Sequence, residues 1–394
     1  MKEHGVVKEI PFNVLLLTSY SLTVDTAGLA RLKALNDGFN KNNVESRIQS
    51  VFSNDNNKLS KLIIPQSIRW PFAAFRLRQD FFKKRNTIIY LYTENFLFSF
   101  VVIILAKIYK ARICVDLCEW FGFSSFVKSY RNIFIGIINY IRYLMFRNLV
   151  INFADGLVCI SNYIKDKVHN KKANIIVVPA IFNMEDIQEI QSLENKISPD
   201  DNKFNIFYSG SFKHYEAFEN FITAAISLIE DVPDMAFVIC GPLSEQDILS
   251  MSKESGIALP ANLFKKVNVK GLVSRTEYIS ELLRSQLILL PRTDSPEARA
   301  SFPTRLPEYL ISSRPIICNS QFDIVNYLSP GKHYIEADFS SSDDIVKNVL
   351  LCFSEYDSVR NIGIQGRERA MKCFSNIYHC SKLKMMFEHL LGNC

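Results

Sequence analysis

The sequence lacks paired cysteines, long uncharged hydrophobic runs and a strong excess of charge of one sign. Its nine cysteines include no two in a C-x-x-C spacing, and most stand within apolar runs. This pattern is typical of reduced, buried thiols and argues against a disulfide framework or a zinc site. The net charge of +6 is mild for 394 residues, so the composition does not indicate nucleic acid as a partner.

Targeting segments are also scarce. The N-terminal stretch MKEHGVVKEIPFN carries charges on both sides of a very short apolar run, and it lacks the apolar core of a signal peptide. The most apolar segment, residues 96–105, has only about half the length that a bilayer crossing requires. We therefore expect a cytoplasmic protein without a transmembrane helix.

The composition of the whole chain is that of a globular protein, with 48% hydrophobic and 22% charged residues. A chain of 394 residues is too long for one ordinary core and predicts two domains. We expect a first domain over 1–190, a second over 204–375, and a C-terminal helix over 376–394 that returns to the first domain. Residues 191–203 are the expected linker, because this region is charged and holds few large apolar side chains.

Short apolar runs alternate with helical patterns in both halves of the chain. Strands that alternate with helices pair in parallel, so each domain is expected to hold a parallel sheet. Ligands of such sheets bind beyond the carboxyl ends of the strands. The predicted strands cover residues 12–17, 46–52, 87–92, 111–117, 155–161, 175–179, 205–208, 235–240, 267–271, 287–290 and 315–318.

Two residues of the first half follow predicted strands and are candidates for the acceptor side of a site. Gly28 stands where a loop enters a helix, and a helix N-terminus can bind an anion, although a turn glycine looks the same. Glu119 emerges with Asp116 at the end of the strand 111–117, where α/β enzymes place reactive groups. A capping or salt-bridged carboxylate explains Glu119 equally well.

Residues 130–150 repeat apolar side chains at helical spacing, with Arg131, Arg142 and Arg147 among them. A basic amphipathic helix of this kind lies on anionic membranes in some proteins and packs on a sheet in others, and the sequence leaves both open. Residues 54–86 interleave basic and aromatic side chains, which we interpret as loops and helices whose charges face water.

The second half offers a phosphate site. The strand 205–208 leads into a short turn with Gly210, Ser211 and Lys213, and then into a helix. Such a turn brings backbone N–H groups and the positive end of a helix dipole together, and Lys213 can add a point charge.

The stretch 289–319 has the order strand, loop, helix and strand. It begins near the turn at Arg292, passes through a polar loop, and enters a helix in which Arg305 and Glu308 are one turn apart. Taken alone, a surface ion pair between these two residues explains their spacing equally well. Within the ordered series of strands, however, we interpret the stretch as a nucleotide-sugar pocket.

Four motifs carry a family resemblance. They are YSGS at 208–211, FVICG at 237–241, KGLVS at 270–274 and FPTRLPEYL at 302–310. Together they resemble the nucleotide-binding half of family 4 glycosyltransferases, above all bacterial members that build capsules, lipopolysaccharide O-antigens and exopolysaccharides. The resemblance covers about residues 204–374, and it is fainter at 158–165 and 177–179.

This resemblance implies the GT-B fold, in which two Rossmann-like parallel-sheet domains face a central cleft. It implies transfer, with retention of configuration, from a UDP- or GDP-linked sugar to a lipid-linked or saccharide acceptor, without metal or other cofactor. Glu308 would hold the ribose, Arg305 and Lys213 would face the diphosphate and serve catalysis with Glu119, and Glu297 would meet the donor sugar. The residues expected at the donor nucleotide are Gly210, Ser211, Lys213, Arg292, Ser301, Phe302, Pro303, Thr304, Arg305, Leu306 and Glu308.

The sequence departs from the family pattern at three places. Ala300 stands where many relatives have a second glutamate, Lys213 replaces the usual basic residues of the first turn, and Cys118 and Glu119 stand where many relatives have a histidine. Two other functions therefore stay open: a sugar-nucleotide epimerase of similar architecture, and a non-catalytic nucleotide-binding subunit. Peripheral contact with the inner face of an anionic membrane is a further expectation.

Overall fold

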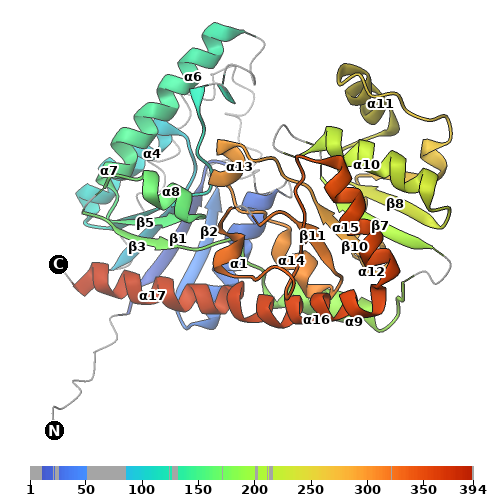
Figure 1. Cartoon of the computed structure of the whole chain (residues 1–394). Helices are drawn as coiled ribbons and strands as arrows, with labels where there is room; N and C mark the ends of the chain where they lie inside the picture. The colour runs from blue at the N-terminus through green and yellow to red at the C-terminus, as the bar shows by residue number, and fades with distance from the viewer. Residues whose placement is uncertain are drawn as a thin grey trace, which may run out of the picture. The chain divides into compact units, whose positions relative to one another are not determined.

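The computed structural model describes residues 11–20, 22, 26–50, 86–123, 125–126, 132–170, 172–199, 203–210, 212, 216–320 and 322–392. The chain forms two compact units. The first comprises Met1–Asn183 together with Asn376–Cys394, and the second comprises Met184–Ser375. Each unit holds a six-stranded parallel sheet with helices around it, which confirms the predicted fold class (Figure 1).

The sheet of the first unit changes winding direction between β1 and β3, which are neighbours in space but not in sequence. Such a switch point is where open α/β sheets bind ligands. In spatial order the strands are β2 (Glu45–Ser50), β1 (Asn13–Thr18), β3 (Thr87–Tyr92), β4 (Arg112–Leu117), β5 (Gly156–Cys159) and β6 (Asn174–Val177).

Helices of the first unit begin at polar caps that the sequence supplies. Asn95 caps α4 (Phe96–Tyr109) by accepting a hydrogen bond from the backbone N–H of Phe98. Lys110, in the left-handed conformation, ends the same helix. The other helices are α1 (Ala27–Lys41), α6 (Ile133–Met145), the π-helical turn η2 (Phe146–Val150), α7 (Ile151–Phe153), α8 (Asn162–Lys167) and α17 (Asn376–Gly392).

Helix α17, the last of the chain, is part of the first unit and packs on α1. The Asn376 side chain donates hydrogen bonds to the carbonyl of Ala34 at 2.9 Å and to the carboxylate of Asp37 at 2.8 Å. Gly38 allows this close approach, because a Cβ there would lie 2.6 Å from the sulfur of Cys380. The C-terminal segment therefore completes the core beneath β1 and β3.

The sheet of the second unit switches direction between β7 and β10, which again are spatial neighbours. Its strands, in spatial order, are β12 (Ile335–Glu336), β11 (Ile316–Cys318), β10 (Leu287–Leu290), β7 (Phe204–Ser209), β8 (Met235–Cys240) and β9 (Val267–Gly271). Its helices are α9 (Met184–Glu194), α10 (Phe218–Asp231), α11 (Glu245–Glu254), η3 (Leu263–Lys265), α12 (Arg275–Arg284), α13 (Pro296–Ala300), α14 (Leu306–Ile311), η4 (Phe322–Asn326), α15 (Ser342–Ser354) and α16 (Tyr356–Cys373).

The boundary between the units differs from the expected one. Helix α9 covers the beginning of the predicted linker 191–203, and the second unit starts at Met184 rather than after residue 203. The apolar residues that precede the predicted linker explain the difference, because Ile187 and Ile190 on α9 are buried.

A buried ion pair connects the elements of the first unit. Arg31 on α1 donates from Nε to Oδ2 of Asp116 on β4 at 2.8 Å, and from its other nitrogens to the carbonyls of Val178 and Pro179. The Tyr90 hydroxyl on β3 donates to the same carboxylate at 2.7 Å. Arg31 is only 7% exposed, so its charge depends on these partners.

Asp116→Ala should destabilise the first unit by about 3–5 kcal/mol, because it leaves the Arg31 cation buried without its carboxylate. Chemical denaturation followed by circular dichroism measures the change. Lys41→Ala is the matched control on α1: it removes a more exposed pair with Asp37 and should cost at most about 1 kcal/mol. Equal losses in both variants would contradict this account of the pair.

Candidate functional site

Glycines end two strands at the carboxyl edge of the second sheet and close in on one another. Gly210 follows β7 and donates to the carbonyl of Cys240 at 3.0 Å, and Gly241 follows β8 and donates to the carbonyl of Gly271 at 2.9 Å. A Cβ on Gly241 would lie 2.0 Å from the carbonyl oxygen of Gly210. Only glycine fits at position 241. The backbone after β7 and β8 therefore lies close together at the edge of the sheet where this fold binds ligands.

The turn after β7 is held by one tyrosine. The hydroxyl of Tyr208 accepts from the N–H of Phe212 at 3.2 Å and donates to Glu216 at 3.1 Å, and its ring stacks on Phe212 at 4.3 Å. A Cβ at position 210 would collide with that hydroxyl, so this position needs glycine as position 241 does. Ser211 and Lys213, which we predicted at the diphosphate, lie outside the described residues.

Arg305 lies against the end of β7. It immediately precedes α14, donates from Nη1 to the carbonyl of Ser209, and stands 3.8 Å from Oε1 of Glu216. The Tyr309 hydroxyl donates to the same carbonyl at 3.4 Å. A positive charge is therefore fixed beside the Gly210 turn, where the sequence predicted an anion.

Glu308 is held by two residues that the sequence analysis did not select. Arg275, at the start of α12, forms an ion pair with Oε1 of Glu308, and Tyr278 donates to Oε2 at 3.2 Å. Arg275 also donates from Nε to Glu189 on α9 at 3.1 Å and lies 3.6 Å from Asp186. The arginine thus has three acidic neighbours, and Glu308 is one of them.

The two members of this ion pair differ in exposure. The side chain of Glu308 is 18% exposed, whereas that of Arg275 is 40% exposed. Burial raises the pKa of Glu308, while Arg275 and the Tyr278 hydroxyl oppose the rise. Arg275 is the more exposed partner, and it also pairs with Glu189 and lies near Asp186.

The remaining donor candidates have other surroundings. Arg292 is buried after β10, donates to the Ser301 hydroxyl and accepts from the Asn319 amide at 2.9 Å through its carbonyl, so it joins three loops. Phe302 packs in the interior against Tyr327 and Phe374. Pro303 and Leu306 are also buried, Thr304 is exposed, and Glu297 is half-buried on α13.

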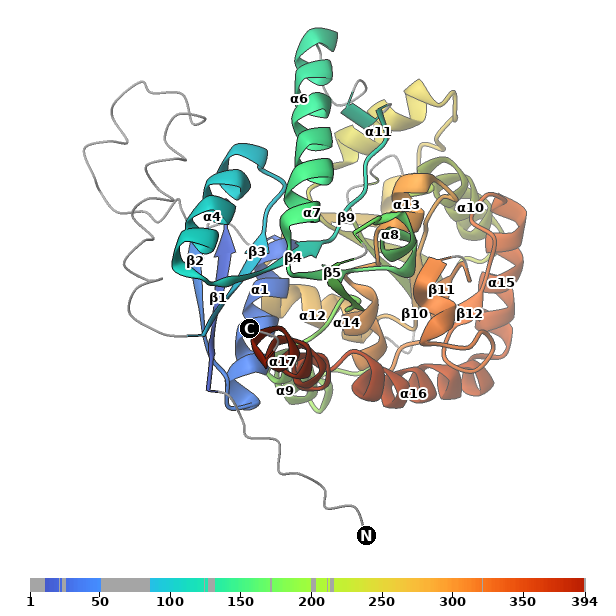
Figure 2. The ribbon, with the colours of Figure 1, turned by 90° about the vertical axis from the view of Figure 1, so that its left-hand side faces the viewer.

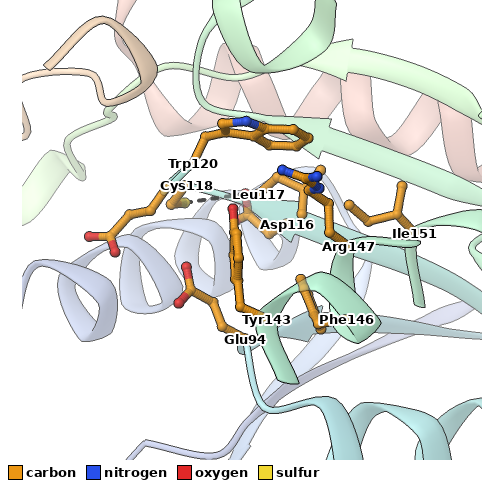
Figure 3. A pocket seen from close by; sticks show the side chains of 10 residues that line it. Glu94, Asp116, Leu117, Cys118, Trp120, Tyr143, Phe146, Arg147 and Ile151 are labelled. Carbon is orange, nitrogen blue, oxygen red and sulfur yellow. Dashed lines mark hydrogen bonds between the residues drawn. The ribbon is translucent and has the colours of Figure 1, made fainter. Parts of the chain in front are cut away.

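In the first unit, a small hollow lies beyond the carboxyl ends of β3 and β4 (Figure 3). Glu94 and the exposed Glu119 line it, together with Cys118, which contacts Asp116. Burial raises the pKa of Glu94 from its usual 4.5 to about 8, and the charge of Glu119 adds to the rise. Three carboxylates therefore line the hollow, those of Glu94, Asp116 and Glu119, and of these only Glu119 was predicted as a site residue from the sequence.

An aromatic wall completes the hollow. The guanidinium of Arg147 lies 4.9 Å from the centre of the Trp120 ring, and the Tyr143 hydroxyl accepts from the N–H of Phe121 at 3.1 Å. An aromatic ring beside carboxylates suits a ligand that has both apolar faces and hydroxyl groups.

Gly28 lies at the beginning of α1, where Thr26 caps the helix by accepting from the N–H of Leu29 at 3.2 Å. A Cβ at Gly28 would lie 2.6 Å from the hydroxyl of Tyr92 on β3. Close packing therefore explains the glycine, and its contact with an acceptor stays a prediction.

Within the described part of the chain, no group of three or more His, Cys, Asp or Glu side chains is placed to hold a metal ion. The ion pair of Arg275 with Glu308 spans 33 positions of sequence, and no local pattern links them. The signal that was available is the helix start after Gly271, where Ser274 caps α12 through the N–H of Glu277. That cap predicts where helix α12 begins, but it does not predict that the Arg275 side chain points toward Glu308.

A family model matches most of the second unit. The family model described as "Glycosyl transferases group 1" matches residues 189–369. No curated protein sequence matches the chain at a significant level.

Solved structures match almost the whole chain at low sequence identity. A glycosyltransferase from Rickettsia africae is 15% identical, with a TM-score of 0.69 over 98% of this chain and 100% of its own. Sucrose-phosphate synthase from Thermosynechococcus elongatus is 12% identical, with a TM-score of 0.68 over 97% and 100%. Anabaena HepE, solved with UDP and glucose, is 12% identical, with a TM-score of 0.64 over 96% and 100%. These likenesses show that the chain has the GT-B fold.

Glu94→Gln should change how stability depends on pH. The raised pKa means that the folded protein binds the proton more tightly than the unfolded chain, so the wild type loses stability as pH rises from about 4.5 to 8. The variant should lack this loss and gain roughly 1–2 kcal/mol over the wild type at pH 8, a figure reduced for partial exposure. Urea denaturation across this pH range measures it, with Glu119→Gln as the control that shifts the loss to lower pH. Parallel curves for wild type and Glu94→Gln would contradict the interpretation.

Arg275→Gln should raise the pKa of Glu308 further, because burial then acts with only Tyr278 opposing it. The folded state again favours the proton, so the variant should lose roughly 1–3 kcal/mol relative to the wild type as pH rises above about 4.5. Denaturation at several pH values measures the loss. The double variant Arg275→Gln/Glu308→Gln should lack it, and a double variant with the same pH dependence as Arg275→Gln would assign the effect elsewhere.

Proposed function

We propose that this chain is a nucleotide-sugar-dependent glycosyltransferase of the GT-B fold, with a group 1 domain over residues 189–369. In this proposal it transfers the sugar to a lipid-linked or saccharide acceptor with retention of configuration. The donor is a UDP- or GDP-linked sugar, and the product belongs to a cell-surface polysaccharide. The observation that supports the proposal is the position of Glu308 in the first turn of α14 and of Arg305 immediately before that helix, with Arg305 bonded to the end of β7 at the switch point.

Glu308 suits the ribose of the donor. A carboxylate can accept hydrogen bonds from two neighbouring hydroxyl groups, and those bonds are stronger because the acceptor is charged. In the structure the same oxygens face Arg275 and Tyr278. Nucleotide binding would therefore replace the Arg275 contact, and Glu189 and Asp186 would keep the released arginine paired.

Arg305 suits the diphosphate. Transfer breaks the bond between the anomeric carbon and the phosphate oxygen, and negative charge grows on the departing nucleoside diphosphate. In this proposal the guanidinium of Arg305, held at the end of β7, stabilises that charge without a metal ion. The new bond forms to an acceptor hydroxyl, whose proton leaves with the phosphate.

The acceptor belongs to the first unit in this proposal. Glu119 and Glu94 offer hydrogen-bond partners for hydroxyl groups, and Trp120 offers a flat apolar face for a sugar ring. A protonated Glu94 can donate as well as accept, which its raised pKa supports near neutral pH.

Glu308→Ala should weaken the binding of UDP or GDP, whichever the protein prefers, by about tenfold or more, because it removes charge-assisted hydrogen bonds. Isothermal titration calorimetry with both nucleotides and their sugars measures the loss. Glu277→Ala is the control, since it removes an exposed carboxylate from α12, the helix that carries Arg275, and should leave nucleotide affinity nearly unchanged.

Nucleotide release from the wild type then separates the candidate functions. Release that depends on added membrane extract supports transfer to an acceptor. Conversion of the donor without acceptor supports an epimerase, and binding without turnover supports a non-catalytic subunit. Unchanged affinity in Glu308→Ala would contradict the proposed ribose contact.

A further inference from the structure

An apolar helix on the first unit is largely uncovered. Helix α6, the π turn η2 and α7 form one continuous helix, Ile133–Phe153, of 21 residues. Its most apolar window has a mean hydropathy of 1.3, and only 22% of that window is buried in the protein. By length and composition this helix is long enough to cross a membrane. In both views it extends well beyond the sheet of its own unit (Figures 1 and 2).

The exposed side chains of this helix form a stripe. Spacings of three and four residues repeat along one side, and the π turn, which is wider than an α turn, keeps the stripe in line. Phe134 is 73% exposed, an unusual position for a phenylalanine in water. The stripe consists of Phe134, Ile138, Ile141, Met145, Leu149 and Phe153.

Helix α4 adds a second stripe beside the first. It contacts both η2 and α6, and its exposed apolar residues are again three or four positions apart. They are Leu97, Phe100, Ile104 and Ile108. We call these two stripes together the apolar face; it is broader than the isolated hydrophobic residues that protein surfaces ordinarily show.

The charged side chains within the helices that form the apolar face are all basic. The sequences of α4, α6, η2 and α7 contain no aspartate or glutamate. Lys107 and Lys110 at the end of α4 and Arg142 on α6 are exposed. A surface that combines apolar side chains with basic ones complements a bilayer that contains anionic lipid. Two copies of the same face would instead bring like charges together.

We propose that the apolar face docks on the surface of an anionic lipid bilayer, with Ile133–Phe153 lying in the interfacial layer. The helix does not leave the protein to cross the membrane, because Tyr143, Phe146, Val150 and Ile151 on its other side are buried in the first unit. Phe134 and its stripe enter the boundary between head groups and acyl chains, and the three basic residues contact anionic head groups.

Docking also deepens the function proposed above, on which this step rests, by naming a lipid-linked acceptor. The inner side of the same helix lines the hollow of Glu94 and Glu119 with Tyr143, Phe146 and Arg147 (Figure 3). One helix therefore contacts the bilayer on one side and the candidate acceptor hollow on the other. An acceptor whose lipid stays in the bilayer can place its head group in that hollow without leaving the membrane.

Co-sedimentation of the full chain with vesicles tests the docking. We expect binding to vesicles of phosphatidylglycerol and phosphatidylethanolamine, with much weaker binding to phosphatidylcholine alone. The variant Phe134→Glu/Ile138→Glu/Ile141→Glu should reduce the bound fraction about tenfold or more, since these side chains are already exposed and their change spares the core. Lys107→Gln/Lys110→Gln/Arg142→Gln should reduce binding to the anionic vesicles and abolish most of its salt dependence.

The matched control places the same number of glutamates at exposed apolar positions elsewhere, as Leu249→Glu/Leu351→Glu/Met385→Glu, and should bind vesicles like the wild type. An equal loss of vesicle binding in this control would overturn the proposal, and so would a wild type that binds neither kind of vesicle. Dimerisation of the wild type in sedimentation, abolished by the Phe134→Glu/Ile138→Glu/Ile141→Glu variant, would also overturn it. Resistance to extraction by alkaline carbonate would overturn interfacial docking in favour of a spanning helix.

Nucleotide titration of the same variants separates this proposal from the proposed function. The face variant should bind the nucleotide like the wild type, and its transfer to a membrane extract should fall with its vesicle binding. Transfer that persists without vesicle binding would overturn the lipid-linked acceptor while leaving the transferase intact. Loss of nucleotide binding by Glu308→Ala, measured without lipid, tests the function alone.

Discussion

The ion pair between Arg31 and Asp116 joins α1 to β3, β4 and the segment after β6 inside the first unit. The carboxyl ends of those strands form the edge beside which Glu94 and Glu119 lie. A buried cation without its carboxylate would be costly, so the pair holds the switch region of the sheet in one arrangement. Burial in the hollow, together with the charge of Glu119, raises the pKa of Glu94.

A second carboxylate, Glu308, is paired in a different way. Arg31 is enclosed and makes its bonds to one carboxylate and two carbonyls, whereas Arg275 is two-fifths exposed and has three acidic neighbours. Loss of one neighbour therefore costs Arg275 little compared with Arg31. This contrast supports a structural role for the first pair and an exchangeable one for the second, where we propose that a nucleotide competes for Glu308.

The apolar face and the hollow share one helix, and the sequence had left its role open. Regular spacing predicted an amphipathic helix at 130–150, but a helix packed on a sheet and a helix on a membrane have the same spacing. The exposure of Phe134, Ile138 and Ile141 separates them, because a side chain that packs on the sheet is not half exposed. The membrane contact itself stays a proposal that the vesicle experiment tests.

The sequence alone determined the alternation of strands and helices, the two parallel sheets and the family resemblance of residues 302–310, because apolar periodicity and motif order are local properties of the chain. Glu308 and Arg305 were also within its reach, since a short motif contains both. The tertiary structure decided their partners: Arg275 and Tyr278 at Glu308, Ser209 at Arg305, and Glu94 opposite Glu119. These contacts join residues about 25 to 100 positions apart, and only packing of the sheets brings such side chains together.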